Sequence, residues 1–228
     1  MVSAQDQIGL IMQLRRRGIR DNNVLRAIER VPRDLFVDPE WADYAYRDEP
    51  LPIACGQTIS QPFVVAFMTE RLELDERHKV LEVGTGSGYQ AAVLSHLCRR
   101  VYTVERWREL QKAAERRFAR LGITNVTTII GDGWLGWPPQ APFDRIIVTA
   151  AAHEPPPALI DQLKDGGRMI IPLGETRDAQ QLVQIDKNGA ALAETPLLPV
   201  RFVPLVHGRA GVSARQPKAS KGAKPDRR

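Results

Sequence analysis

The middle of the chain alternates short apolar runs with patterns of helical length. The apolar runs are rich in Val, Ile and Leu and have the length of strands, at residues 80–83, 101–105, 126–130 and 143–149. Helical patterns lie between them at residues 89–98 and 107–121. Residues 143–149 are nearly all apolar after Arg145, as expected for a central strand of a parallel sheet. The pattern predicts parallel strands joined by crossover helices.

Beyond this region the pattern predicts a mixed sheet. A helix is expected to start at residues 155–157 and run toward residue 163. Three further strands are expected at residues 168–172, 181–185 and 201–205. The Asn188-Gly189 pair is typical of a hairpin turn and predicts that some of these strands are antiparallel.

Two helical patterns precede the first strand. Residues 3–17 form an amphipathic pattern that Gly18 ends. Its apolar residues fall on or near one face, namely Ile8, Ile11, Met12 and Leu14. Residues 21–31 form a second helical pattern, with Asp21 or Asn22 as its cap. We expect both helices to cover the sheet.

An irregular segment follows at residues 36–53, where three prolines interrupt any periodicity. It contains Trp41, Tyr44 and Tyr46. Aromatic residues at this density are typical either of a pocket wall or of packing anchors for a loop. The sequence leaves both interpretations open.

The first candidate site is a glycine-rich turn at residues 79–89. The strand pattern ends in Glu82 and Val83, and Gly84, Gly86 and Gly88 follow at alternating positions. Such a turn lets a ligand approach the backbone closely. It does not match the dinucleotide fingerprint, because Tyr89 occupies the position of the third glycine, and it has no Walker lysine.

Two more acidic residues follow the next two strands. Glu105 ends the run at residues 101–105, where a carboxylate can accept both hydroxyls of a ribose. Asp132 follows the run at residues 126–130. Together with Glu82, these acids suit a ligand that carries a ribose and a positive charge but no phosphate.

A small, polar stretch at residues 56–62 precedes a helical pattern at residues 63–72. Thr58 and Ser60 can both direct hydroxyls toward a ligand. Ser60 is equally suited to cap the following helix, with Pro62 in the first turn.

Charge is distributed unevenly along the chain. Seven Lys or Arg and one Asp give residues 209–228 a charge of +6, which leaves −1 for the rest of a chain whose total is +5. A nearly neutral body argues against a dedicated nucleic-acid surface. The tail has no apolar periodicity, so we expect it to be disordered, either solvated or bound weakly to anions such as RNA.

The remaining composition points to an ordinary globular protein. An apolar content of 43% is enough for a core. No apolar run approaches the roughly 18 residues of a membrane span, and no signal-peptide pattern is present, so a cytoplasmic location is expected. Two cysteines and four scattered histidines predict neither disulfides nor a metal site. Without a coiled-coil pattern, a monomer is expected.

Five motifs occur in an order that resembles one family. They are GQTISQP at residues 56–62, VLEVGTGSGYQ at 80–90, GDGW at 131–134, FDRIIVTAA at 143–151 and RFVPL at 201–205. The chain is similar in these motifs to the protein-L-isoaspartate O-methyltransferases over about residues 5–208. The glycine motif fits any class I S-adenosylmethionine-dependent methyltransferase, whereas the first and last motifs are typical of this family.

The resemblance implies a fold and a division of the chain. The fold would be an α/β, Rossmann-like class I methyltransferase, with a mostly parallel sheet, helices on both faces, an N-terminal helical cap and antiparallel C-terminal strands. Residues 1–78 would supply the cap and the active-site loop. Residues 79–208 would form the cofactor-binding core of the same compact domain, and residues 209–228 the basic tail.

The resemblance also implies a reaction. A methyl group would pass from S-adenosylmethionine to the free α-carboxylate of an L-isoaspartyl residue in a damaged peptide or protein, leaving S-adenosylhomocysteine and starting repair through a succinimide. No metal is involved. Ser60 would be the catalytic residue that orients the carboxylate. The substrate would also be bound by Thr58, Ile59, Gln61, Val203 and Leu205.

The cofactor residues follow from the same resemblance. They would be Glu82, Gly84, Thr85, Gly86, Ser87, Gly88, Glu105, Asp132 and Gly133. Glu82 would lie near the amino group of the methionine part, Glu105 would hold the ribose and Asp132 would accept from the adenine amino group. His153 is expected either to line this cleft or to lie on the surface.

Three other functions fit parts of the sequence. A methyltransferase acting on a small molecule or RNA would share the glycine turn, and the basic tail favours the RNA version. A non-catalytic cofactor-binding module would not need Ser60. An NAD-dependent oxidoreductase is disfavoured by Tyr89.

Overall fold

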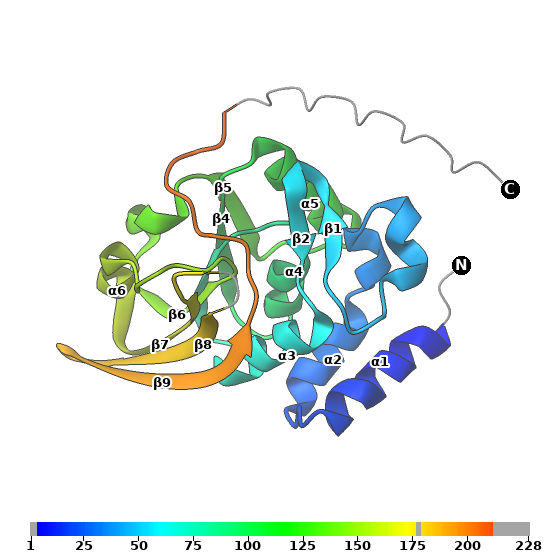
Figure 1. The fold of residues 1–228 in the computed structure, drawn as a ribbon, viewed down its shortest axis with the longest axis horizontal. Helices are drawn as coiled ribbons and strands as arrows, with labels where there is room; N and C mark the ends of the chain where they lie inside the picture. Colours follow the sequence, from blue (N-terminus) through cyan, green and yellow to red (C-terminus); the bar gives the residue numbers. More distant parts are fainter. Residues whose placement is uncertain (1–3, 177–178, 212–228) are drawn as a thin grey trace, which may run out of the picture.

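A computed structural model describes residues 4–176 and 179–211 of the chain. Its centre is a seven-stranded sheet with the strand order β5-β4-β3-β6-β7-β8-β9 (Figure 1). Five strands are parallel to one another: β3 (Lys79–Val83), β4 (Arg100–Glu105), β5 (Val126–Ile130), β6 (Phe143–Val148) and β7 (Leu163–Leu173). The last two, β8 (Gln180–Asn188) and β9 (Ala191–Val200), are antiparallel. The predicted mixed, mostly parallel sheet is confirmed.

The order of the strands reverses at β3. This strand pairs with β4 on one side and with β6 on the other, and Val83 is in register with Val104 and Val148. The connections that leave these strands therefore diverge at their carboxyl ends. In open α/β sheets such a reversal creates the crevice in which ligands bind.

Side chains alternate between two cores on either side of the sheet. Val80 packs into a core with α4 (Tyr89–Ser95), α5 (Arg108–Arg120) and the N-terminal helices, whereas Leu81 packs into a core with α6 (Pro157–Gln162). This alternation has the two-residue period of a strand. Helices therefore cover both faces, as predicted, with most of them on the Val80 side.

Three helices before β3 lie together on one side of the molecule, α1 (Ala4–Arg16), α2 (Asn22–Arg30) and α3 (Pro62–Arg71) (Figure 1). Asp21 caps α2, because its Oδ1 accepts the N–H of Asn23 at 2.7 Å. The prediction of which residues form the buried face of α1 is partly wrong. Leu10 and Leu14 are buried, whereas Ile8 and Met12 are 54% and 55% exposed, because the covered stripe is too narrow to reach them.

The segment between α2 and α3 is more regular than its prolines suggested. It forms the 3-10 helices Arg33–Phe36 and Pro39–Tyr44, then a short antiparallel hairpin of β1 (Leu51–Ile53) and β2 (Gln57–Ile59) joined by the 3-10 turn Ala54–Gly56. Trp41 packs edge-on against Tyr44, and the Tyr46 hydroxyl donates to Asp34 at 2.9 Å. Trp41 and Tyr46 also pack against the core and so anchor the segment, whereas Tyr44 is exposed.

The C-terminal part of the sheet differs from the prediction. Residues 201–205 are not a strand, and the last strand is β9. Its sequence contains Pro196 and Pro199, which lower the strand signal but are tolerated where a strand has a free edge. The expected strand at residues 168–172 also starts earlier, at Leu163. The hairpin between β8 and β9 is confirmed, with Asn188 paired to Ala191.

Residues 201–208 form an extended strap instead. The Ala151 N–H donates to the Val203 carbonyl at 2.8 Å, and the Leu205 N–H donates to the Ala151 carbonyl at 2.7 Å. In Figure 1 this orange segment leaves β9 and runs past the central strands. The strap thereby comes to lie beside the end of β6.

Within the described ranges, no helix has both the length and the apolar character that crossing a bilayer requires. Most of the basic tail, residues 212–228, lies outside the described residues. Its expected disorder stays a prediction.

The two cores predict how the fold responds to truncation. Leu81 is fully buried, so Leu81→Ala is expected to lower the free energy of unfolding by about 2–5 kcal/mol in a urea titration. Leu192→Ala, on edge strand β9, is the control: its side chain is 42% exposed, and the expected loss is within about 0.5 kcal/mol. Equal losses in the two variants would contradict this packing.

Candidate active site

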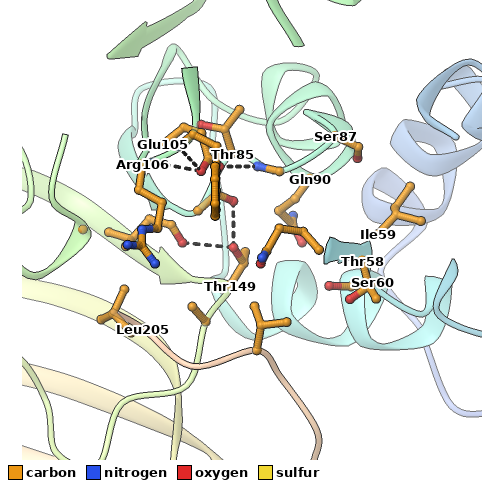
Figure 2. Close-up of a pocket in the computed structure, with 18 of the residues that line it drawn as sticks. Thr58, Ile59, Ser60, Thr85, Ser87, Gln90, Glu105, Arg106, Thr149 and Leu205 are labelled. Carbon is orange, nitrogen blue, oxygen red and sulfur yellow. Dashed lines mark hydrogen bonds between the residues drawn. The ribbon is translucent and has the colours of Figure 1, made fainter. Parts of the chain in front are cut away.

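A pocket lies at the carboxyl ends of β3, β4 and β6, where the strand order reverses (Figure 2). Its lining comes mainly from the glycine turn, the end of β4, the end of β6, the β1–β2 hairpin and the strap. Their lining residues include Gly84–Ser87, Glu105–Trp107, Thr149, Ala150, Gln57–Ser60 and Val203–Val206. Segments far apart in sequence thus meet at one cavity.

The floor of the pocket depends on a close approach between Gly84 and Thr149. Gly84 has a φ of 98°, and a Cβ there would lie 2.4 Å from Thr149 Oγ1. The Thr149 hydroxyl instead lies within hydrogen-bonding distance of the carbonyl oxygens of Gly84 (2.7 Å) and Val83 (3.0 Å). Any side chain at residue 84 would displace the Thr149 hydroxyl and would be strained at this positive φ.

Gly88 ends the turn and starts α4. Its φ is 90°, and a Cβ would meet the Phe118 ring at 2.9 Å and Ala114 at 3.0 Å. The absence of a side chain therefore lets α5 pack directly against the start of α4. The first and last glycines of the motif are explained by packing, and Gly86 lies in the pocket wall between them.

Glu105 joins the end of β4 to the glycine turn. Its carboxylate accepts backbone N–H groups from Gly86 (2.8 Å), Arg106 (2.8 Å) and Trp107 (2.9 Å). Burial raises the pKa of the Glu105 carboxyl, and these three donors oppose that shift. Figure 2 shows the carboxylate at the pocket wall beside Thr85. It is placed as a fixed acceptor for a ligand.

Glu82 lies beneath the pocket and does not line it. The side chain is fully buried, and its Oε2 accepts the Thr103 hydroxyl at 2.5 Å. The Thr103 hydroxyl lies 2.7 Å from that of Thr85, which does line the pocket. Burial raises the pKa of the Glu82 carboxyl to about 8. Glu82 therefore reaches the pocket through two threonine hydroxyls.

Asp132 also lies outside the pocket lining. Its two carboxylate oxygens accept the N–H groups of Trp134 (2.9 Å) and Gly208 (2.7 Å), so the carboxylate fastens the strap to the end of β5. The neighbouring Gly133 does line the pocket. A Cβ at Gly133 would lie 2.6 Å from Val83 and 3.0 Å from Leu205. The predicted contact of Asp132 with adenine stays a prediction.

Two aromatic contacts complete this attachment. Trp134 donates from Nε1 to the Leu205 carbonyl at 3.1 Å, and its ring stacks on that of His207 with the ring centroids 4.5 Å apart.

His153 lies on the surface, with its side chain 65% exposed, and does not line the pocket. Of its two interpretations, the structure supports the surface one.

Ser60 follows β2 and is not a helix cap. The N-cap of α3 is Gln61, which makes no side-chain capping bond. The expectation that Ser60 caps the helix is therefore wrong, whereas Pro62 does lie in the first turn as expected. Figure 2 shows Thr58 and Ser60 together on the side of the pocket away from Glu105 and Arg106. In this position both hydroxyl residues are available to a ligand.

A second cavity adjoins the first at these residues. Thr58, Ser60, Thr149 and Val203 line both cavities. The second is a groove of about 500 Å³ that includes Arg17, Phe63 and residues 198–203. The site therefore consists of an inner pocket at the glycine turn and an outer groove, with Ser60 at their junction.

Some residues at the site were not assigned a role from the sequence. Thr149 follows β6 within the motif at residues 143–151, and Gln90 ends the motif at residues 80–90. Both line the pocket, and the Gln90 amide donates to Thr69 at 2.9 Å. Arg33 donates to the Ser60 carbonyl from 27 residues away. The sequence around Arg33 gave no signal for a site, since only the fold brings this residue to Ser60.

Comparison with known families identifies the chain. The family model for protein-L-isoaspartate(D-aspartate) O-methyltransferase matches residues 5–210. The chain belongs to this family. Curated relatives of the same name include one from Parvibaculum lavamentivorans, 61% identical over 90% of this chain and 93% of the relative. Another, from Xanthobacter autotrophicus, is 58% identical over 90% of this chain and 94% of the relative.

Solved structures agree with this family assignment. A protein-L-isoaspartate O-methyltransferase is 33% identical, with a TM-score of 0.80 over 90% of this chain and 67% of that chain. A Plasmodium falciparum protein assigned to the same activity, solved in complex with S-adenosyl-L-homocysteine, is 28% identical, with a TM-score of 0.77 over 87% of this chain and 97% of that chain. The isoaspartate methyltransferase fold expected from the motifs is thus confirmed.

The buried acid in this isoaspartate methyltransferase fold predicts a pH effect on stability. The folded-state pKa of Glu82 is about 8, well above its value of 4.5 in an open chain, so ionisation of Glu82 destabilises the folded state as the pH rises through this interval. Glu82→Gln cannot ionise. We therefore expect the difference in unfolding free energy, variant minus unmodified chain, to increase from pH 5 to pH 8 in urea titrations. A difference independent of pH would contradict the burial of a titrating carboxyl.

Proposed function

We propose that the chain transfers a methyl group from S-adenosylmethionine to the free α-carboxylate of L-isoaspartyl residues in peptides and damaged proteins. The observation that carries the proposal is the junction at Ser60. An inner pocket at the glycine turn suits the cofactor, an outer groove suits a peptide, and the hydroxyl residues Thr58 and Ser60 line both. Family membership supplies the substrate class.

The chemistry needs placement more than proton transfer. A bond forms between a carboxylate oxygen and the methyl carbon as the bond from that carbon to sulfur breaks, and its electron pair stays on sulfur. An anion and a sulfonium cation become a neutral ester and S-adenosylhomocysteine. The substrate carboxyl has a reference pKa of about 4, so no base is required at neutral pH. Alignment and exclusion of water are what the protein supplies.

We assign the cofactor to the inner pocket. The methionine part would lie against Gly84, Thr85, Gly86, Ser87 and Gly88. Glu105 would accept the ribose hydroxyls, since its carboxylate is already fixed by backbone donors at the pocket wall. Glu82 would act on the amino group through Thr103 and Thr85. Gly133, with Asp132 behind it, would border the adenine. The proposed reaction uses no metal ion.

We assign the substrate to the outer groove. The Ser60 hydroxyl would orient the isoaspartyl carboxylate, with help from Thr58 and the backbone at Ile59 and Gln61. Val203 and Leu205 lie on the strap that borders both the pocket and the path of the peptide. An extended peptide can pair with backbone groups of such a strap.

The resulting ester would close to a succinimide, as the neighbouring backbone nitrogen attacks and methanol leaves. Hydrolysis of the succinimide returns part of the material to a normal aspartyl linkage, so that repeated cycles repair the damage. We place this activity in the cytoplasm and expect the protein to act as a monomer, with the basic tail free to bind anions weakly.

The substrate assignment is tested with two synthetic peptides that differ only in an isoaspartyl or an aspartyl residue. Radiolabelled methyl from S-adenosylmethionine is expected in the isoaspartyl peptide and not in its aspartyl twin. Equal labelling of both peptides, or labelling of neither, would rule out the proposed substrate.

The division between pocket and groove predicts opposite effects of two substitutions. Ser60→Ala is expected to lower kcat about tenfold or more while calorimetric Kd values for S-adenosylhomocysteine stay within about threefold. Glu105→Gln removes the charge that would hold the ribose and is expected to raise that Kd about tenfold. If Ser60→Ala weakens S-adenosylhomocysteine binding as much as Glu105→Gln does, Ser60 belongs to the cofactor site instead.

A further inference from the structure

A fully buried arginine lies behind the loop that carries Ser60. Arg33 begins the 3-10 helix Arg33–Phe36, and its side chain is 0% exposed. Burial lowers the pKa of its guanidinium to about 10, which leaves the group charged at neutral pH. Replacing a buried charged group by an apolar side chain of similar size is often neutral or stabilising, so a buried arginine calls for a reason beyond stability.

The contacts of Arg33 suggest that reason. Its guanidinium donates to two backbone carbonyls, that of Ala45 through Nε (2.8 Å) and that of Ser60 through Nη2 (2.8 Å). The guanidinium also lies over the ring of Tyr89, 4.8 Å from its centroid, and Tyr89 lines the inner pocket. Arg33 thus connects the carbonyl of Ser60 to Ala45 and Tyr89, which are both buried.

A second contact holds the other side of the same loop. The Asp48 carboxylate, with its side chain 4% exposed, accepts the Phe63 N–H at 2.8 Å, and its backbone carbonyl accepts the Gln61 side-chain amide at 2.8 Å. The backbone from Ser60 to Phe63 is therefore fixed at both ends. The Ser60 hydroxyl has no hydrogen bond to a described residue, so its direction depends on this backbone.

We propose that Arg33 is a positioning residue for the methyl transfer. It holds the Ser60 backbone in the orientation that presents the hydroxyl to the substrate carboxylate at the junction of pocket and groove. The inference rests on the proposed function of Ser60. One part of the proposal, that Arg33 orders the loop carrying Ser60, can be tested without measuring enzyme activity.

The test compares Arg33→Lys with a control, Arg145→Lys. Lysine keeps the charge but lacks the fork that reaches two carbonyls. Arg145 is partly buried and also donates to backbone carbonyls, among them that of Leu72 (2.6 Å), but these partners line neither cavity, whereas Ser60, the partner of Arg33, lines both. If Arg33→Lys does not fold, Arg33→Met replaces it, because it removes the buried charge while keeping much of the side-chain length.

Amide hydrogen exchange provides the readout that is independent of activity. Faster exchange over residues 58–64 is expected in Arg33→Lys, and not in Arg145→Lys at a temperature where both remain folded. Unchanged exchange in this loop would overturn the proposal. The exchange test applies even if the wild-type chain does not methylate an isoaspartyl peptide. That outcome would overturn the proposed function instead.

Turnover then tests the link to Ser60. Arg33→Lys is expected to lower kcat about 10- to 100-fold, with Kd for S-adenosylhomocysteine within about threefold, whereas Arg145→Lys leaves both nearly unchanged. In a Ser60→Ala background the same Arg33 substitution is expected to change kcat less than threefold, because residues that act together are not additive. Full additivity of the two substitutions, or an equal loss in the Arg145 control, would overturn the positioning role.

Discussion

The close approach of β3 and β6 at their carboxyl ends is the constraint on which the site depends. Gly84 has no side chain, and the Thr149 hydroxyl occupies the space that a Cβ would take, hydrogen-bonded to the carbonyls of Val83 and Gly84 at the start of the turn. This contact sets the floor of the inner pocket. The hairpin on one side and the strap on the other are arranged around that floor, and both reach it from distant parts of the chain.

The charged groups of the site are held by backbone contacts and hydroxyls more than by opposite charges. Glu105 accepts three backbone N–H groups, Asp132 accepts two, and Arg33 donates to two carbonyls. Such contacts fix direction as well as position and need little rearrangement during a reaction. An arrangement of this kind suits a transfer whose rate depends on the alignment of two reactants.

The parts of the molecule that local pattern determines were predictable from sequence. The parallel strands, the glycine turn and the cap at Asp21 each carry their signal within a few residues. The strap and the Arg33 contact do not, since Asp132 meets Gly208 across 76 residues and Arg33 meets Ser60 across 27. Strand β9 was missed because Pro196 and Pro199 weaken its pattern, and only its place at the sheet edge makes them acceptable. Ser60 was found through family motifs, but its place between two cavities required the fold.

The central claim is that this site accelerates methyl transfer by placement, with no proton moved in the chemical step. The most direct test is the solvent deuterium isotope effect on the single-turnover rate with saturating S-adenosylmethionine and isoaspartyl peptide. We expect a ratio of rates in H2O and D2O of about 1, because an ionised carboxylate attacks the methyl group and no general base takes part. A ratio of about 2 or more would show a proton in transfer at the rate-limiting step and would contradict the account.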